Sequence, residues 1–186
     1  ISGRIEGGHS MKRIAIAAAV LLMTLTGTVT AKAETATGYP NATHEAAMNW
    51  ALAQADAGIT YSMYGARDGS DGTMDCSGFV LEALRQVGVD VPLTNTVGML
   101  WRTDSYGGSV FTQVPLETAK KGTIVVAGGL DGNGAGGHVF FLLEDYRGLD
   151  TPVLECSYAY NGIATVNTFW YASMYLDEPV ALVVAE

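Results

Sequence analysis

Basic residues are scarce in this sequence. It has 10 Lys and Arg against 19 Asp and Glu in 186 residues, which gives a formal net charge of −9 at pH 7. A surface of this sign repels phosphate backbones, so we expect no nucleic-acid partner. It also argues against a basic module that adheres to anionic polymers, and it favours a protein that stays soluble.

Histidine and cysteine are scarce too, with three and two residues. No two histidines stand at the spacing of a zinc site, so a zinc-dependent hydrolase is excluded and we expect no metal and no cofactor. The Gly-rich loop that begins at Asp131 is not an EF-hand. Its fifth and twelfth positions, which need an oxygen ligand and a Glu, hold Ala135 and Leu142.

A hydrophobic run long enough to cross a bilayer is also lacking. The strongly apolar stretch from Ile14 to Leu25 falls well short of the roughly 20 residues that a spanning helix needs. It follows Met11 and two basic residues and precedes the small-residue cleavage site 31–33, which is typical of a secretory signal. We therefore predict a tag at 1–10, a signal peptide at 11–33, and one secreted, extracellular, monomeric domain at 34–186.

The order of secondary structure predicts an α+β fold. Apolar spacing indicates a helix over 43–57, with His44 exposed in its first turn, and a short helix over 95–102 with Trp101 pointing inward. Apolar and β-branched runs indicate later strands, and helices followed by strands favour an antiparallel sheet. The expected strands are 123–127, 138–144, 153–157 and 180–184, with short strands and loops over 158–175.

Cys76 stands at the start of a second amphipathic helix, which Gly88 ends. The helical spacing puts the cysteine on the buried side, and the unpaired N–H groups and dipole of a helix N-terminus favour a thiolate there. We predict that Cys76 is a catalytic nucleophile. The alternative is an inert cysteine packed in the core, which is the more common role of a free thiol. The apolar face comprises Phe79, Val80, Ala83, Leu84 and Val87.

His138 and Glu155 are the candidate partners of this thiol. His138 opens an apolar strand directly after the glycine loop, and Glu155 lies within the next strand. If these strands are neighbours, the carboxylate can reach the ring and orient it as a general base. Strand alternation puts Glu155 and Ser157 on one face and Cys156 on the other. A disulfide between the two cysteines, the default in a secreted protein, is thereby disfavoured.

Four segments resemble a known family. Asp75-Cys76-Ser77-Gly78-Phe79-Val80 resembles the nucleophile motif of NlpC-type cell-wall cysteine peptidases, and Gly136-Gly137-His138-Val139 resembles their histidine strand. The segments 61–63 and 158–163 extend the similarity to phage-type peptidoglycan amidohydrolases and the related CHAP domains. The resemblance implies a papain-like fold with N-terminal helices packed on an antiparallel sheet.

The resemblance also implies roles for individual residues. Cys76 becomes the nucleophile and His138 the base, while Tyr61 helps at the oxyanion site. The third position usually holds His in the phage-type pattern, whereas this chain has Glu155 as in CHAP domains. CHAP domains carry Asn where this chain has Ser157. Asp75 and Ser157 are supporting residues in this interpretation.

The function predicted on these grounds is that of a secreted peptidoglycan hydrolase. It would cleave an amide of the stem peptide, as an endopeptidase or an N-acetylmuramoyl-L-alanine amidase, through a thioester on Cys76. A catalytically inactive wall-binding or inhibitory module, or a transglutaminase-like acyltransferase, are the alternatives. Candidates for the substrate cleft, each equally explained as a surface or core residue, are Arg67, Trp101, Tyr106 and Trp170.

Overall fold

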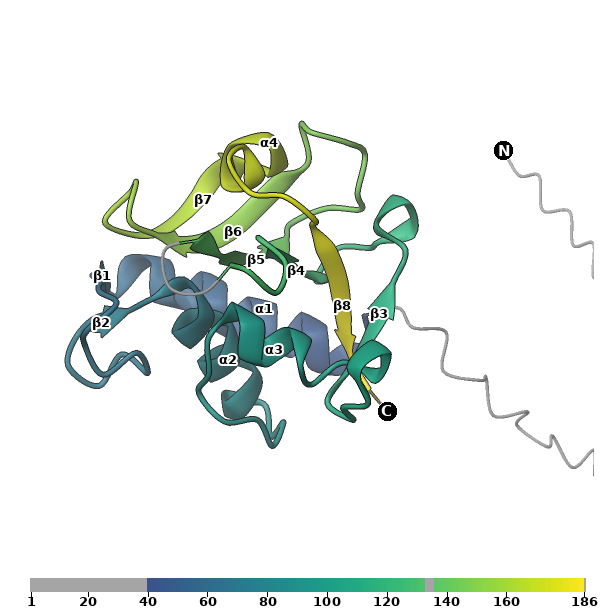
Figure 1. Ribbon diagram of the computed structural model, residues 1–186. Helices are drawn as coiled ribbons and strands as arrows, with labels where there is room; N and C mark the ends of the chain where they lie inside the picture. The colour runs from purple at the N-terminus through teal and green to yellow at the C-terminus, as the bar shows by residue number, and fades with distance from the viewer. Residues whose placement is uncertain (1–39, 133–135, 186) are drawn as a thin grey trace, which may run out of the picture. The chain divides into compact units, whose positions relative to one another are not determined.

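A six-stranded antiparallel sheet forms the centre of the structure, in the order β3-β8-β4-β5-β6-β7 (Figure 1). The computed structural model describes residues 40–132 and 136–185. Helices combined with this sheet confirm the α+β class. The strands are β3 (Phe111–Val114), β4 (Ile124–Ala127), β5 (His138–Leu142), β6 (Pro152–Ser157), β7 (Gly162–Thr168) and β8 (Val180–Val184).

Helices cover both faces of the sheet (Figure 1). The helices α1 (Ala42–Ala53) and α2 (Cys76–Gln86) pack against each other, and α2 contacts β5 and β6. On the other face α4 (Phe169–Ser173) contacts β5, β6 and β7. Shorter helical segments lie between these elements: α3 (Thr96–Leu100), η1 (Gln54–Asp56), η2 (Asp104–Tyr106) and η3 (Leu116–Thr118).

Strand alternation divides the core into two clusters. In β5, Val139 and Phe141 pack toward α1 and α2, whereas Phe140 and Leu142 pack with Phe169 of α4. All four strand residues have no exposed surface. A sheet that is covered on both sides needs apolar residues on both of its faces. The sequences of these strands are therefore continuously apolar instead of alternating between apolar and polar residues.

The helix that begins at Cys76 is more deeply buried than its apolar stripe predicts. Phe79, Val80, Ala83 and Leu84 are fully buried as expected, and Leu81 outside the stripe is fully buried too. Burial of one Leu or Phe side chain contributes about 1.5–3 kcal/mol, so α2 is a major source of stability. The chain leaves the helix through Gly88, whose φ of 89° confirms the predicted left-handed end.

The prediction for His44 is wrong, because the side chain is fully buried rather than exposed. Val184 donates its backbone N–H to Nε2 of His44 at 2.8 Å, so Nδ1 carries the proton and donates to the Gly122 carbonyl, also at 2.8 Å. The ring thus joins α1 to the turn before β4 and to the C-terminal strand. Burial lowers the pKa of His44, although the bond to Gly122 opposes this effect.

The structure also contains elements that the sequence pattern did not indicate. Strand β3 follows a turn, and α4 lies within the segment that we expected to hold only strands and loops. Trp101 is 54% exposed, which contradicts its predicted inward position. Two strands of two residues, β1 (Thr60–Tyr61) and β2 (Thr73–Met74), form a small parallel pair.

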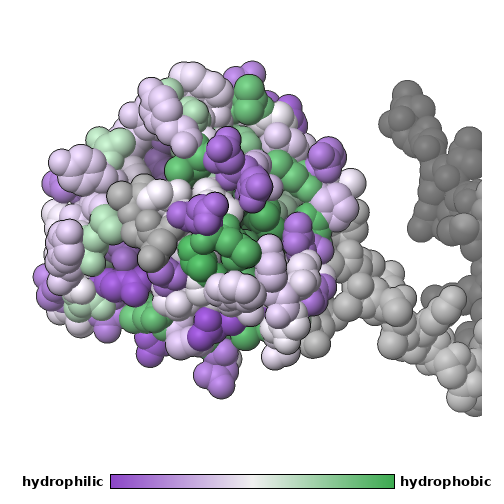
Figure 2. Space-filling model, viewed as in Figure 1, coloured by the Kyte–Doolittle hydropathy of each residue, from purple (hydrophilic) through white to green (hydrophobic). Residues whose placement is uncertain are grey.

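Some predictions fall on residues outside the described ranges. The tag at 1–10 and the signal peptide at 11–33 are among them. Within 40–132 and 136–185, no helix is long and apolar enough to span a membrane. On the face seen in Figure 2, hydrophobic residues gather near the middle and hydrophilic residues are spread around them.

Candidate active site

Cys76 is positioned by the small β1–β2 pair. Tyr61 lies opposite Met74 in this pair, and the chain passes from Met74 through Asp75 directly into α2. The parallel pairing therefore places the Tyr61 side chain beside the start of the helix. Cys76 is 7% exposed and lines a small cavity of about 180 Å³. A thiol in this position is buried against the core yet open to a reactant on one side.

Asp75 caps the helix and is itself held by Arg67. Its Oδ1 accepts the backbone N–H of Gly78 at 2.5 Å, which satisfies one of the free donors at the helix start. Arg67 donates from Nε to Oδ2 of Asp75 at 2.6 Å. The same guanidinium donates from Nη2 to Ser77 Oγ at 2.8 Å and to the Thr94 carbonyl at 2.7 Å. Arg67 thus ties the first turn of α2 to the loop before α3.

The glycine of the cysteine motif has a steric role. A Cβ on Gly78 would lie 2.2 Å from the carbonyl oxygen of Arg67, closer than any real contact. The backbone at Arg67 is itself left-handed, with a φ of 67°. Gly78 therefore allows the Arg67 loop to lie directly against the first turn of α2.

His138 begins β5 directly after Gly137, which borders the small cavity that Cys76 lines. A Cβ on Gly137 would lie 2.2 Å from the Gly132 carbonyl oxygen and 2.3 Å from Thr96 Oγ1. Thr96 also donates its hydroxyl to the Gly132 carbonyl at 3.1 Å, which fixes this part of the glycine loop to α3. The His138 side chain is 13% exposed. Close backbone packing thus sets the direction in which the ring leaves the strand.

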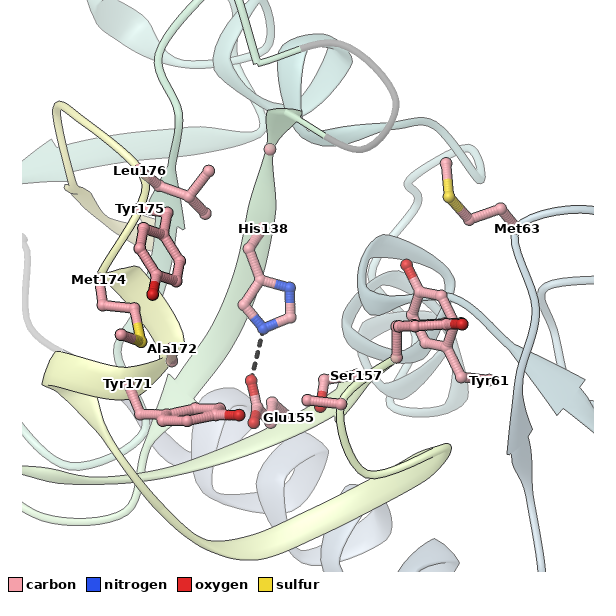
Figure 3. A pocket seen from close by; sticks show the side chains of 13 residues that line it. Tyr61, Met63, His138, Glu155, Ser157, Tyr171, Ala172, Met174, Tyr175 and Leu176 are labelled. Carbon is pink, nitrogen blue, oxygen red and sulfur yellow. Dashed lines mark hydrogen bonds and ion pairs between the residues drawn. The ribbon is translucent and has the colours of Figure 1, made fainter.

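Glu155 of β6 orients the His138 ring. Strands β5 and β6 are antiparallel neighbours, which meets the condition set for contact between the two side chains, and Nε2 of His138 lies 2.5 Å from Oε2 of Glu155 (Figure 3). Burial raises the pKa of Glu155, but bonds from His138 and Asn167 outweigh burial and hold the pKa below its usual value. The carboxylate is therefore ionised and can only accept, so the proton lies on Nε2.

This tautomer leaves Nδ1 of His138 available to Cys76. Burial alone lowers the pKa of His138, but hydrogen bonds to Cys76 and Glu155 and the attraction of both groups outweigh it and raise the pKa to about 10. A ring with this pKa holds a proton well above neutral pH. The three side chains can therefore support a thiolate–imidazolium pair.

Asn167 is a member of the site that the sequence pattern did not reveal. Its Nδ2 donates to Oε1 of Glu155 at 2.5 Å, and the side chain is buried. The register of β6 with β7 shifts between Val153 and Glu155. Without this bulge, alternation would direct Asn167 to the opposite face of β7, away from the carboxylate. No signal in the sequence alone marks the bulge.

Tyr61 supplies a hydroxyl on the Cys76 side of the site. Burial raises the pKa of Tyr61, followed by the nearby charges of Cys76 and Asp75, so the phenol stays protonated. Its hydroxyl makes a hydrogen bond to Cys76. The ring packs edge-to-face on Tyr158 with centroids 6.1 Å apart. Tyr61 is thus a neutral donor held beside the thiol.

Two adjoining cavities meet at this site. The small one is of mixed polarity and includes Cys76, Arg67 and Asn95 in its wall. The larger one has a volume of about 500 Å³ and is largely apolar, with His138 and Glu155 in its wall. Tyr61, Met63 and Gly137 border both. In Figure 3 Tyr171, Met174, Tyr175 and Leu176 lie on one side of the His138 ring, and Tyr61 and Met63 on the other.

A family of known proteins matches the part of the chain that contains this site. The family described as bacteriophage peptidoglycan hydrolase matches residues 43–181, a range that contains every residue of the two cavities. The chain belongs to this family. No curated protein matches the sequence. Membership of this family indicates a hydrolase of peptidoglycan, which agrees with the resemblance drawn from the sequence motifs.

The structure brings most of the predicted site residues of the hydrolase together and leaves others outside. Asp75 and Cys76 border the small cavity, His138, Glu155 and Ser157 the large one, and Tyr61 both. Arg67 reaches the small cavity, but its guanidinium is engaged with Asp75, Ser77 and Thr94. Three aromatic candidates border neither cavity of the hydrolase: Trp101, Tyr106 and Trp170.

Cys156 of the hydrolase is separate from this machinery. It faces away from Glu155 and lies in the cluster with α1 and α2, where its Sγ is 3.5 Å from the Met74 carbonyl oxygen. Both cysteines are free. Burial, and then the nearby charges of Cys76 and Asp75, raise the pKa of Cys156 to about 12. A thiol with this pKa stays protonated and unreactive.

The described residues of the hydrolase offer no ready metal site. No group of three or more His, Cys, Asp or Glu side chains within 40–132 and 136–185 is arranged to hold a metal ion. The chemistry that this geometry can perform is nucleophilic, with a thiol, an imidazole and a carboxylate in sequence.

Proposed function

We propose that the protein is a secreted cysteine hydrolase that cleaves an amide bond of the peptidoglycan stem peptide. The observation that carries this proposal is the Glu155–His138 bond of 2.5 Å, made by a ring that also interacts with Cys76. Family membership supports peptidoglycan as the substrate. The arrangement of a thiol, a base and an orienting carboxylate supports nucleophilic attack by Cys76 as the reaction type. The signal-like segment before residue 34 supports secretion to the cell wall.

The proposed reaction begins from the thiolate–imidazolium pair, in which Nδ1 of His138 already holds the proton of the Cys76 thiol. The thiolate attacks the amide carbonyl, and the developing oxyanion is stabilised by the Tyr61 hydroxyl and the backbone N–H of Cys76. The imidazolium then donates its proton to the leaving amine, and a thioester to Cys76 remains. His138 next takes a proton from water, the resulting hydroxide attacks the thioester, and the thiol is released with a carboxylic acid.

Glu155 and Asn167 support this sequence without touching the substrate. Glu155 keeps the Nε2 proton in place, so that only Nδ1 exchanges a proton with the thiol. Asn167 holds the second carboxylate oxygen. We also propose that the fold is papain-like, because a nucleophile at the start of a helix and a base on the adjacent sheet is the arrangement that this fold uses.

An inactive wall-binding module is a less well supported alternative. Such a module has no need for a buried Glu155 bonded on both oxygens, since an unused buried carboxylate costs stability without benefit. Transfer of the acyl group to an amine instead of water shares every step up to the thioester. The products distinguish hydrolysis from transfer, because only hydrolysis leaves a new carboxylic acid.

The proposal is tested by digesting purified peptidoglycan and analysing the products by mass spectrometry. A muramoyl–alanine amidase produces peptides that begin at alanine, whereas an endopeptidase produces shortened muropeptides. Digestion in H₂¹⁸O places one heavy oxygen in the new carboxylic acid if water is the acceptor. An intact wall after incubation with the wild-type enzyme contradicts the hydrolase proposal.

A further inference from the structure

We propose that the large cavity beside His138 is a subsite for an N-acetylated sugar ring of the glycan strand. This inference rests on the proposed function, because it assigns a part of the substrate to the same site. The cavity holds about 500 Å³, within the range of pockets that enclose ligands of drug-like size, whereas the small cavity of about 180 Å³ does not reach it. The two cavities therefore suit different parts of one substrate.

The wall of the large cavity is rich in tyrosine rings with exposed surface. Tyr158 is 82% exposed, Tyr171 42% and Tyr175 87%. The Tyr171 ring lies beside the Tyr160 ring, with 6.1 Å between centroids, so a neighbouring side chain helps to hold it in place. The face of an aromatic ring is electron-rich. The C–H groups on one face of a pyranose pack on such a surface, while its hydroxyl groups stay in water.

The wall of the large cavity presents little charge of its own. No Lys or Arg is among the residues of its wall in the described ranges, and the Glu155 carboxylate is 1% exposed and paired with the His138 ring. The carboxylates and ammonium groups of stem peptides would lose hydration there without meeting an unpaired opposite charge. An alanine methyl group would leave most of the volume empty. The uncharged sugar ring is the one large group of the polymer that suits an aromatic wall.

Ser157 adds a polar contact on the same wall. The side chain is 8% exposed, and its hydroxyl interacts with the Glu155 carboxylate without forming a hydrogen bond of good geometry among the described residues. A hydroxyl both donates and accepts, so Ser157 Oγ retains capacity for a hydrogen bond to a ligand. A hydroxyl or acetamido group of the sugar provides such a partner. Because this wall includes His138, a sugar held there places the muramoyl–alanine amide near the catalytic residues.

The kinetic test compares two soluble substrates that share one scissile amide. The first is N-acetylmuramoyl-L-alanyl-D-isoglutamine, and the second carries a lactoyl group in place of the muramic acid ring. We expect the wild-type enzyme to lose at least tenfold in kcat/KM without the sugar. The variant Tyr171→Leu keeps apolar volume but lacks the aromatic face. It should lose about three- to tenfold on the sugar substrate and nothing on the other.

Tyr106→Leu is the matched control, since Tyr106 is 45% exposed and borders neither cavity. It should cleave both substrates as the wild type does. Equal rates on the two substrates, or equal losses by Tyr171→Leu on both, overturn the sugar subsite while leaving the hydrolase intact. An apolar peptide group in the cavity would produce the second of these results.

A binding test separates the sugar subsite from the proposed chemistry. The Cys76→Ala protein is titrated by NMR with the peptide-free disaccharide of N-acetylglucosamine and N-acetylmuramic acid. We expect saturable shifts at residues of the large cavity, and the double variant Cys76→Ala/Tyr171→Leu should lose them. This result supports the subsite even if neither soluble substrate is cleaved. Absence of binding to the Cys76→Ala protein overturns the subsite, even if the wall is hydrolysed.

Discussion

Asn167 and Glu155 are joined by a hydrogen bond of 2.5 Å to the carboxylate oxygen that does not contact His138. Each oxygen of Glu155 thus has a partner, and the Ser157 hydroxyl adds a further interaction with the carboxylate. Hydrogen bonds to charged groups contribute about 1.5–3 kcal/mol, so loss of either partner should change how well Glu155 orients the ring.

Asn167→Ala should lower kcat by about tenfold and leave KM nearly unchanged, because a loosened Glu155 holds the His138 ring less well. Asn167→Asp should cost more. A second carboxylate beside Glu155 raises the pKa of the pair and weakens the charge that faces His138. Kinetics as a function of pH provide the measurement. A purely structural Asn167 would lower the melting temperature without changing kcat or the pH profile.

The alkaline limb of the pH–rate profile reports the proton on His138. The imidazolium donates to the leaving amine, so activity should fall as pH rises through the His138 pKa of about 10. Glu155 contributes to raising this pKa, and its removal should therefore move the limb to lower pH. The measurement is kcat against pH for wild type and Glu155→Gln. An unmoved limb in the variant contradicts the assigned role of Glu155.

Arg67 should matter through Asp75 rather than through the substrate. Arg67→Met leaves the Asp75 carboxylate, which is 12% exposed, without its cation. We expect a loss of about 3 kcal/mol in the free energy of unfolding by urea, within the range for a broken buried pair. Arg67→Met/Asp75→Asn should recover a large part of this loss, since no unpaired charge remains. Additive losses in the double variant argue against a coupled pair.

His44 should make stability depend on pH near neutrality. Its pKa is lowered in the folded protein, so the unfolded chain binds the proton more readily. The contribution is therefore fully present above the ordinary pKa of about 6.5 and is lost as pH falls below it. His44→Gln can keep bonds to Gly122 and Val184 but does not titrate. Melting temperatures between pH 8 and 5 should fall less steeply for this variant than for wild type.

The sequence was sufficient to predict those parts of the site that depend on local pattern. The helix beginning at Cys76 follows from apolar spacing, and the facing of Glu155 from strand alternation. His44 could not be placed in this way, because its burial depends on Gly122 and Val184, which are distant in the chain. Asn167 was missed because a bulge reverses the alternation from which its face would be predicted.

The residues predicted to line a substrate cleft could not be identified from the sequence for the same reason, because their positions depend on contacts between distant segments. Arg67 was expected to contact substrate, but its partners come from two separate segments, the start of α2 and the loop before α3, which meet only in the folded protein. The exposed Trp101 and Tyr106 rings pack on each other at 5.1 Å between centroids, away from both cavities. Residue type alone indicates that an aromatic ring can bind a substrate, and only tertiary structure shows which rings lie near Cys76 and His138.

The most direct test of the cysteine mechanism compares Cys76→Ala with Cys156→Ala on a suspension of purified cell walls. Cys156 is buried on the opposite face of β6 and serves as a matched control for loss of a thiol. We expect Cys156→Ala to clear the suspension at close to the wild-type rate and Cys76→Ala to lose at least a thousandfold, with both variants folded by circular dichroism. Clearance by Cys76→Ala at the wild-type rate would contradict the mechanism.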